Sequence, residues 1–577
     1  MKKSPSRQDG SAAIEDKQLL IRMAQGETPA ALVLKNASYV NVFSQEVLKG
    51  DIAIADGIIV GIDDYRGMTE IDMTGKTIVP GFIDSHIHLE SSLLSPGEFA
   101  RAVLSHGTTT VIADPHEIAN VCGLAGLDYM LEATAGLPID VYFMLPSCVP
   151  AAPVDENGAS LTAEDIDRYY SHPRVRGLAE MMNYPGVITG DEDVLCKIVK
   201  AQQHDAVIDG HAPGLSGKPL AAYTCAGITS DHECASLEDA LEKLRLGQHI
   251  MIREGTAAQT LEALIPLLPP QYAPRCMFAT DDKHPLDLLE KGHIDYIARK
   301  AVSLGADPIL TVSLTSWNAA QYFRLKNKGA VAPGYIADLA VLDDLQTFSV
   351  CAVFKNGRLV PTDTELTVPQ ISVELQQRVH HTFDLPEITV DRLHADHSLA
   401  LIGMVPGQIF SRNLGFADRT DPEKDILKAA VAERHHHTGH IGLAYIRGYG
   451  LKRGAVATSV AHDSHNLIGI GANDADLALA MNRVTEIGGG MVVVDAGAVT
   501  AEIALPIAGL MSEAPIAEVN RTLESVKAHA YAQGAGRGID PFMNLSFLSL
   551  PVIPELRLLT QGAFDVEAWE FVNPPAG

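Results

Sequence analysis

Short apolar segments alternate with amphipathic segments through the middle of the chain, from residue 79 to about residue 330. The apolar segments have the length of strands, and the segments between them carry hydrophobic residues at helical spacing. The predicted strands, each with the residues at its carboxyl end, lie at 77–88, 108–113, 139–145, 175–180, 206–211, 228–232, 249–253 and 276–281. Eight strand-then-helix units in about 250 residues predict a closed parallel (β/α)8 barrel of the α/β class. Because no glycine-rich phosphate motif follows the first strand, an open dinucleotide-binding sheet is disfavoured.

Strand-rich segments lie on both sides of the predicted barrel. Short strands are expected between residues 31 and 62, with a tight hairpin turn at Asp56-Gly57, and again at 337–342 and 350–354. We expect these strands to pair into one β-sandwich. The predicted organisation is an N-terminal tail with a short helix (1–28), the two parts of the sandwich (29–78 and 331–370), the barrel (79–330) and an additional α+β region (371–577).

The composition disfavours several classes of function. The formal net charge is −28, which disfavours binding to nucleic-acid phosphates or to an anionic membrane. Seven scattered cysteines with no Cys-x-x-Cys pair fit a reducing compartment, and the polar N-terminal segment lacks the apolar core of a signal peptide. We therefore expect a cytoplasmic protein that binds neither nucleic acid nor membrane.

His86-Ile87-His88 ends the first predicted barrel strand. Side chains alternate across a strand, so both imidazoles project to the same side and offer half of a transition-metal site. For an isolated pair of this kind, polar residues where a strand meets solvent are the better explanation. The metal hypothesis therefore depends on further ligands at the other strand ends.

The later strand ends supply residues of the required types, since they carry imidazoles and carboxylates. The candidate metal ligands are His86, His88, Glu180, His211, His232 and Asp281. Strand ends converge on one face of a barrel, so four imidazoles and two carboxylates would suffice for two divalent ions bridged by Glu180. Taken singly, His211 and His232 also fit hydrogen-bonded core histidines, and Asp281 also fits a helix N-cap.

Three segments resemble a known family. Residues 79–88 (VPGFIDSHIH) resemble the first-strand signature of the amidohydrolase superfamily, which implies a metal-containing (β/α)8 barrel and a flanking β-sandwich. Residues 113–120 (ADPHEIAN) are similar to the second-strand motif of bacterial adenine deaminases, and residues 459–466 (SVAHDSHN) resemble their extra C-terminal domain. The resemblance covers nearly the whole chain after the first twenty or so residues.

The bridging position separates branches of the superfamily. Dihydroorotases and hydantoinases usually bridge their metals through a carboxylated lysine, whereas this chain has Glu180 there. The resemblance to adenine deaminases implies a bridging glutamate with two Mn²⁺ ions, with Fe²⁺ as the alternative and Zn²⁺ less favoured. It also implies hydrolysis of adenine to hypoxanthine and ammonia, in purine salvage or adenine catabolism, by a homo-oligomer (a dimer or larger).

For this reaction we assign candidate roles to further residues. Asp281 is the candidate to take a proton from the attacking water and to pass it to the leaving ammonia. The proton donor to N1 is left open between Glu233, Glu117 and His116, and Glu233 equally fits a residue that orients His232. The candidate substrate contacts are Asp114, Asn120, Arg253, Glu254, His462 and His465.

Several of these segments keep alternative interpretations. Arg253 also fits an ion pair at the barrel rim, and residues 462–465 fit a lid, a further metal site or a polar turn. The run 435–437 fits a solvated helix surface. As a whole, the chain also fits a different nucleobase deaminase, a cyclic-amide hydrolase or a non-catalytic scaffold. The presence of all six candidate ligands disfavours the scaffold.

Overall fold

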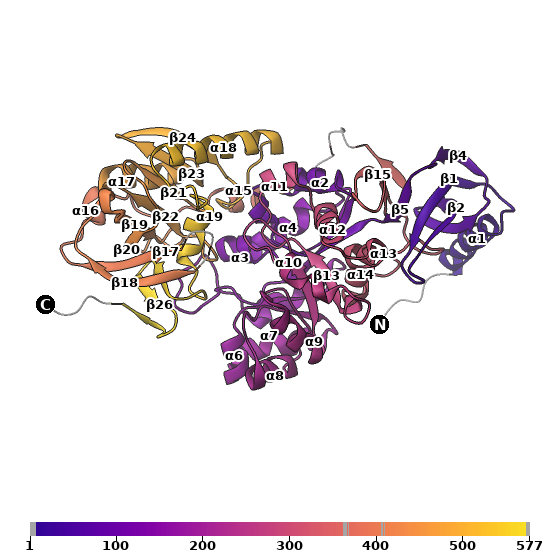
Figure 1. Cartoon of the computed structure of the whole chain (residues 1–577), viewed down its shortest axis with the longest axis horizontal. Helices are drawn as coiled ribbons and strands as arrows, with labels where there is room; N and C mark the ends of the chain where they lie inside the picture. Colours follow the sequence, from indigo (N-terminus) through magenta and orange to yellow (C-terminus); the bar gives the residue numbers. More distant parts are fainter. Residues whose placement is uncertain (1–6, 362–365, 367–368, 406–407, 409, 573–577) are drawn as a thin grey trace.

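The computed structural model describes residues 7–361, 366, 369–405, 408 and 410–572 (Figure 1). One sheet lies at the N-terminal end, strands and helices alternate in the middle, and a second large sheet lies at the other end. Helix α1 (Arg7–Ala24) occupies most of the segment 1–28 that was predicted as a tail with a short helix. In the described part of the chain, no helix is long and apolar enough to cross a membrane.

The N-terminal sheet combines strands from two distant parts of the sequence. Its strands are β1 (Ala30–Asn41), β2 (Glu46–Ala55), β3 (Ile58–Asp63), β4 (Gly67–Asp72), β5 (Thr77–Pro80), β14 (Leu339–Leu342), β15 (Val350–Lys355) and β16 (Arg358–Val360). The order is β16-β15-β14-β5-β1-β2-β3, with β4 beside β1. Strand β14 pairs antiparallel with β5, so segments before and after the central region share one sheet.

The hairpin between β2 and β3 turns at the predicted position. Ala55 pairs with Ile58, and the two residues between them, Asp56 and Gly57, have φ angles of 49° and 76°. Positive φ at both central residues is what a type I′ turn requires, and aspartate followed by glycine adopts it at low cost. The prediction of a tight turn at this dipeptide is confirmed.

The central region contains eight short parallel strands. They are β6 (Phe82–Ile87), β7 (Thr108–Ala113), β8 (Asp140–Leu145), β9 (Val175–Met181), β10 (Val207–Gly210), β11 (Ser230–Asp231), β12 (His249–Arg253) and β13 (Cys276–Ala279). They form a five-stranded sheet, β10-β9-β8-β7-β6, and a three-stranded sheet, β11-β12-β13. Backbone hydrogen bonds join the two sheets on both sides, from Thr229 N to Ile208 O at 3.0 Å and from Asp281 N to His86 O at 2.9 Å.

Helices follow the central strands along the chain and pack against them, in the middle of the molecule in Figure 1. They are α2 (Pro96–Leu104), α3 (His116–Cys122), α4 (Leu124–Ala133), α5 (Ala163–Asp167), α6 (Tyr184–Thr189), α7 (Glu192–Gln203), α8 (Gly217–Cys225), α9 (Leu237–Arg245), α10 (Leu261–Leu264), α11 (Pro285–Glu290), α12 (Ile294–Ser303), α13 (Pro308–Val312) and α14 (Asn318–Tyr322). Helix α7 is typical, because the Asp191 side chain caps its N-terminus and Ile198 and Ala201 form its buried face.

The C-terminal region is built on a second eight-stranded sheet. The strands are β17 (Leu399–Met404), β18 (Ser411–Ala417), β19 (Leu427–Ala432), β20 (Ile441–Arg447), β21 (Ala455–Thr458), β22 (Leu467–Gly471), β23 (Gly490–Asp495) and β24 (Ala498–Ala504). Their order is β18-β17-β20-β19-β22-β21-β23-β24. The other elements are α15 (Val373–His380), α16 (Val390–Leu393), α17 (Asp474–Glu486), α18 (Ile516–Ala532), α19 (Met543–Ser546), β25 (Leu556–Leu559), β26 (Gly562–Asp565) and β27 (Glu570–Phe571).

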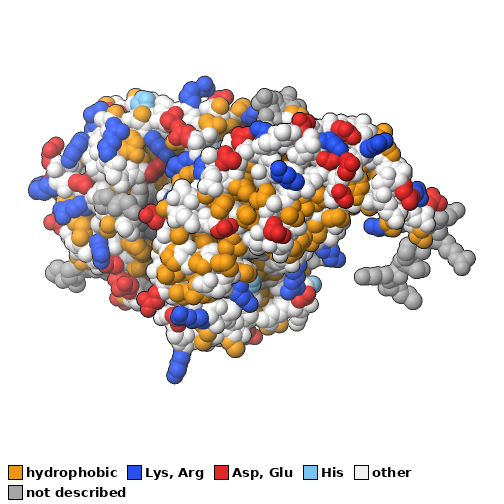
Figure 2. Space-filling model, turned by 45° about the vertical axis from the view of Figure 1, so that its right-hand side comes forward, with side chains coloured by type: hydrophobic (Ala, Val, Ile, Leu, Met, Phe, Trp, Pro, Cys, Tyr) orange, Lys and Arg blue, Asp and Glu red, His pale blue; other side chains and the backbone are white. Residues whose placement is uncertain are grey.

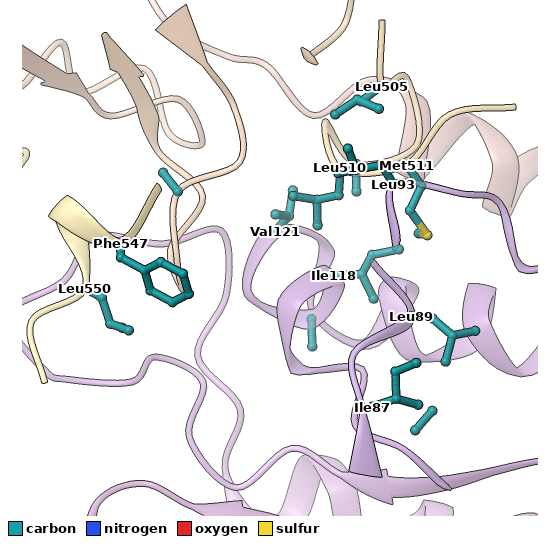
Figure 3. Close-up of a cluster of buried hydrophobic side chains, with 14 of the residues drawn as sticks. Ile87, Leu89, Leu93, Ile118, Val121, Leu505, Leu510, Met511, Phe547 and Leu550 are labelled. Atoms are coloured by element: carbon teal, nitrogen blue, oxygen red, sulfur yellow. The ribbon is translucent and has the colours of Figure 1, made fainter. Parts of the chain in front are cut away.

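The central and C-terminal regions share one hydrophobic core. Ile118 and Leu93 of the central region lie beside Leu510 and Met511 of the C-terminal region (Figure 3). The backbone reinforces this contact, because Ser512 N donates to Leu93 O at 2.8 Å and Ser512 O accepts from Ser95 N at 2.9 Å. Burial of apolar surface on both sides fixes the C-terminal region over the segment that follows His88.

Candidate metal centre

The six predicted metal ligands lie together at the carboxyl ends of the central strands. They are His86 in β6, His88 just after it, Glu180 near the end of β9, His211 just after β10, His232 just after β11 and Asp281 two residues after β13. All are buried except His211, which is partly exposed. Parallel strands deliver their last residues to one edge, which explains how ligands so far apart in sequence meet.

His86, His88 and Asp281 form the first group of candidate ligands. His86 Nε2 lies 3.2 Å from His88 Nε2, and Asp281 Oδ1 lies 3.6 Å from the former atom and 3.1 Å from the latter. Two ligand atoms that are each about 2.1 Å from one ion, at a tetrahedral angle, lie about 3.4 Å apart. The three atoms are therefore spaced to surround one divalent cation.

Glu180, His211 and His232 form the second group. Glu180 Oε2 lies 2.6 Å from His211 Nδ1 and 3.1 Å from His232 Nε2, and the two imidazole nitrogens are 3.3 Å apart. The other oxygen of Glu180, Oε1, faces the first group at 3.6 Å from His86 Nε2 and 3.3 Å from His88 Nε2. One carboxylate thus presents one oxygen to each group, which is the arrangement of a bridging ligand.

Hydrogen bonding leaves the appropriate nitrogen of His88 free for a metal. His88 Nδ1 lies 3.1 Å from the backbone oxygen of Asp114, and a carbonyl oxygen only accepts, so Nδ1 carries the proton. Nε2 faces Glu180 and Asp281, and its lone pair becomes available to an ion when the imidazole is neutral. Metal-binding imidazoles in proteins characteristically donate their other N–H to a carbonyl or carboxylate in this way.

Both carboxylates of the centre are ionised. Burial raises the pKa of Glu180, but the neighbouring His232 and His211 outweigh it and hold this pKa well below its usual range. Burial also opposes ionisation of Asp281, and Arg253 outweighs it and holds that pKa well below its usual range. Two anionic carboxylates are therefore available to divalent cations near neutral pH.

Arg253 makes the ion pair that was one of its two predicted roles. Its Nη1 lies 2.5 Å from Glu233 Oε1 and 2.5 Å from Asp281 Oδ2, and its Nη2 lies 2.8 Å from Glu233 Oε2. Glu233 Oε1 is also 3.7 Å from His232 Nε2 and 3.6 Å from His211 Nδ1. The structure thus places Glu233 beside the second group, with both of its oxygens paired to Arg253.

The segment after β7 adds polar side chains next to the bridging carboxylate. His116 Nδ1 lies 3.0 Å from Asp114 Oδ2 and 3.6 Å from Glu180 Oε1. Asn120 is one turn further along α3, where its amide donates to His116 O at 3.0 Å and accepts from Asn157 Nδ2 at 2.8 Å. Because both ends of its amide are engaged within the protein, Asn120 holds this segment in place.

Glu254 points away from the centre. Its Oε1 pairs with Lys300 on α12 at 2.5 Å, and among the described residues it has no hydrogen bond or ion pair to a candidate metal ligand. Successive side chains of an extended segment project to opposite sides, so the residue after Arg253 faces outward. The structure therefore brings together the predicted site residues except Glu254.

Two histidines of the C-terminal region reach Glu117 on α3. His462 Nδ1 lies 2.7 Å from Glu117 Oε1, and His465 Nε2 contacts Glu117 Oε2. These side-chain types suit a metal site, but Ala461 N–H donates to His465 Nδ1 at 3.2 Å. The proton of neutral His465 is therefore on Nε2, which donates to the carboxylate and has no lone pair for an ion.

Residues 435–437 lie in the loop between β19 and β20, so the prediction that they belong to a helix surface is wrong. The carboxylate of Glu433 accepts hydrogen bonds from the backbone of His436 at 2.8 Å and of Thr438 at 3.0 Å, which turns the chain. His435 Nε2 reaches Ser464 O at 2.9 Å. This loop therefore supports the segment that carries His462 and His465.

A small cavity of about 20 Å³ lies between the central and C-terminal regions. This is room for about one water molecule. Its lining includes Ser91, Asp282, His284, His462, Met543 and Phe547. Sequence reasoning missed all of these except His462. Asp282 could have been found from its place next to Asp281, whereas Phe547 belongs to no motif that points to a site.

Comparison with known proteins agrees with this arrangement. Residues 77–360 match the amidohydrolase family, and residues 411–570 match the adenine deaminase C-terminal domain. "Adenine deaminase 2" of Carboxydothermus hydrogenoformans is 46% identical over 96% of this chain and 98% of its own length. "Adenine deaminase" of Desulfatibacillum aliphaticivorans is 45% identical over 96% of this chain and 99% of its own length.

The central strands and the ligand set define an enzyme of the amidohydrolase class. That class is metal-dependent, which agrees with the two groups of candidate ligands around Glu180. Within the class, this chain belongs to the adenine deaminase family.

Proposed function

We propose that this chain hydrolyses adenine to hypoxanthine and ammonia. The observation that carries the proposal is the position of Glu180, whose two oxygens face separate groups of imidazoles. A glutamate at this strand end, instead of a lysine that can be carboxylated, disfavours a cyclic-amide hydrolase. Membership of the adenine deaminase family supports the same substrate.

Two divalent transition-metal ions fit the ligand set. His86, His88 and Asp281 would hold one ion, His211 and His232 would hold the other, and Glu180 would bridge them. We propose Mn²⁺ first, Fe²⁺ second and Zn²⁺ third, since imidazole and carboxylate ligands accept all three. When bound, such a pair of ions lowers the pKa of water and supplies hydroxide near neutral pH.

Asp281 is placed to move protons during the reaction. Its Oδ1 faces His86 and His88, while Arg253 holds Oδ2 and so fixes the direction of the carboxylate. In our proposal Asp281 takes a proton from the attacking water and transfers it to the amino group that leaves C6. Arg253 acts as a positioning residue for this carboxylate.

The purine site is proposed at the junction between the central and C-terminal regions. Adenine is small and uncharged, so an enclosed site with a few polar groups suits it. His462 lines the cavity there and shares its partner Glu117 with His465, while Asp114 is bonded to His116. The donors of Arg253 and the amide of Asn120 are already paired, which favours positioning roles for both.

The finer organisation of the chain belongs to the same proposal. We propose that the eight central strands close into a (β/α)8 barrel spanning 79–330, flanked by a β-sandwich of 29–78 and 331–370 and followed by an α+β domain over 371–577. Hydrogen bonds on both sides of the two central sheets support closure. We further propose a cytoplasmic homo-oligomer, and Figure 2 shows hydrophobic side chains across the middle of one face that a second copy could cover.

The test is an assay of the Mn²⁺-loaded protein with adenine, combined with metal analysis of the same sample. We expect release of ammonia and hypoxanthine with about two metal ions per chain. Release of ammonia from another aminopurine but not from adenine, or hydrolysis of a cyclic amide, would overturn the assignment. Full turnover without a bound transition metal would overturn the proposed metal centre.

A further inference from the structure

Hydrogen bonds within the C-terminal region hold the segment between β21 and β22, residues 459–466. His462 N donates to Ser546 O at 3.0 Å, and His465 N donates to Ala461 O at 2.7 Å. Arg434, which is fully buried, donates through Nε to His465 O and through Nη2 to Ala508 O at 3.0 Å. These contacts fix the positions of the two imidazoles that meet Glu117.

Glu117 accepts from both imidazoles and has no proton to give. Burial raises its pKa, but His462 and His465 outweigh burial and hold the pKa well below its usual range. His465 is neutral, because burial lowers its pKa to about 4. The charge of Glu117 is therefore balanced by His462 at 2.7 Å and by the more distant His116, whose Nε2 is 3.6 Å from Oε1.

His462 has an ionised partner at Nδ1, and its side chain lines the small cavity of about 20 Å³. Its ring stacks on Phe547 with a centroid separation of 4.6 Å and an interplanar angle of 17°. Nδ1 is bonded to Glu117, whereas Nε2 has no hydrogen-bond partner in the part of the chain that the structure describes. Burial opposes a charge here, but Glu117 raises the pKa of His462 to about 9.

The other candidate proton donors have different surroundings. Both oxygens of Glu233 are paired with Arg253. His116 Nδ1 is bonded to Asp114 Oδ2, and its Nε2 is 3.6 Å from Glu117 Oε1. Neither Glu233 nor His116 lines the cavity, whereas His462 does, beside Ser91 and Asp282. Asp282, which lines the cavity, directly follows Asp281 of the proposed metal centre in the sequence.

We propose that His462 is a catalytic residue of the C-terminal region that donates the proton to N1 of adenine, with Glu117 as its positioning residue. This inference rests on the proposed adenine deaminase function. A carboxylate bonded to Nδ1 holds an imidazole in one orientation and stabilises its charged form, as in catalytic His–carboxylate pairs. The C-terminal region would then complete the active site as well as stabilise the fold.

The proton transfers in this proposal balance. The Nε2–H bond of His462 breaks and an N1–H bond forms as hydroxide adds to C6, with the C6=N1 π electrons forming the new bond. Asp281 gives its proton to the amino group, and the C6–N6 bond breaks to release ammonia. The hydroxyl proton freed as the C6 carbonyl forms restores the imidazolium of His462.

The test compares Mn²⁺-loaded variants of the full chain. In His462→Asn the side-chain amide can still donate to Glu117 but cannot act as an acid, so kcat should fall by about 10³-fold, with KM and metal content little changed. Because His462 and Glu117 act as a unit, kcat of the double variant Glu117→Gln/His462→Asn should be at most about threefold lower than kcat of His462→Asn. His437→Asn, at a surface position where φ is +54°, is the matched control and should retain wild-type activity.

The pH profile distinguishes catalysis from a structural role. The titratable groups that face His462 are Glu117 on α3, Asp282 and His284 after β13, and Asp463 and His465 on its own loop. Glu117→Gln removes the nearest negative charge, which lowers the pKa of His462, so the alkaline fall of kcat should move to lower pH. An unmoved alkaline limb in this variant would overturn the proposal, and this readout serves even where His462→Asn fails to fold.

The activity of the wild type distinguishes failure of the proposed function from failure of the proposed role of His462. If the wild type releases no ammonia from adenine, the proposed function fails. If the wild type is active and His462→Asn keeps kcat within about threefold of it, only the role of His462 fails. If the loss of kcat in the double variant equals the product of the losses in Glu117→Gln and His462→Asn, the two residues act independently. That result would also overturn the proposed pair.

Discussion

The guanidinium of Arg253 lies 2.5 Å from Oδ2 of Asp281, which leaves Oδ1 of that carboxylate to face the imidazoles of His86 and His88. One oxygen is thus used for position and the other for the proposed chemistry. The same guanidinium binds both oxygens of Glu233, so a single cation orders two carboxylates beside the metal centre. The first two predictions concern this pair.

Replacing Asp281 by Asn should reduce kcat by at least about 10³-fold, because an amide cannot accept the proton of the attacking water. The metal content should stay largely intact, since the other candidate ligands are unchanged. Ammonia release and elemental analysis of the same preparation check this prediction. A variant with full activity would exclude Asp281 as the proton carrier.

Replacing Arg253 by Met should destabilise the protein by about 3–5 kcal/mol, because Glu233 and Asp281 would lose the cation that pairs them in a buried setting. Chemical denaturation measures the change. Arg245, on the exposed side of α9, provides the matched control, and Arg245→Met should stay within about 0.5 kcal/mol of the wild type. Equal stability of the two variants would contradict the structural importance of this ion pair.

Metal affinity should increase with pH between about 6.5 and 9. In the metal-free protein burial lowers the pKa of His211, but Glu233 and Glu180 outweigh it and raise the pKa to about 9. The pKa of His88 is also raised well above its usual value, by Asp281 and Glu180 against the effect of burial. These imidazoles hold protons at neutral pH, and a bound ion must displace them.

Titration of the metal-free protein with Mn²⁺, in buffers that differ in ionisation enthalpy, measures those displaced protons. Proton release should be largest near pH 7 and should decline above about pH 9, where the imidazoles are already neutral. Affinity that is constant from pH 6 to pH 9 would show that these histidines are not ligands.

Replacing Leu510 by Ala should cost about 2–5 kcal/mol, because its fully buried side chain fills the core shared by the central and C-terminal regions (Figure 3). Thermal and chemical unfolding measure the loss. Leu246→Ala, at a residue that is 41% exposed, is the control and should change stability by less than about 0.5 kcal/mol. A loss that is no larger at Leu510 would argue against a shared core.

Sequence reasoning identified the candidate ligands because each one ends a strand in a repeating pattern. Parallel strands must deliver His86, Glu180, His211 and Asp281 to one edge, so their meeting follows from chain topology alone. The Asp56-Gly57 turn could likewise be predicted from the sequence, because few dipeptides tolerate two positive φ angles.

The partners of Glu117 and Arg253 could not be predicted from the sequence in the same way. Glu117 meets His462 and His465 across 345 and 348 positions of sequence, and no periodicity connects residues so far apart. Arg253 was equally consistent with binding substrate or with pairing at the rim, and only the tertiary structure shows that it pairs with Glu233 and Asp281. Such choices depend on which charged groups are buried together.

The sequence by itself therefore determined the class of fold, the ligand types and their order along the strands, because strand alternation and metal chemistry are local properties. The tertiary structure alone decided which oxygen of Glu180 faces which histidines, which nitrogen of His88 is bonded to Asp114 O, and that His462 of the C-terminal region contacts Glu117. Those features arise from close packing of segments far apart in the chain, which fixes atoms to within a hydrogen bond.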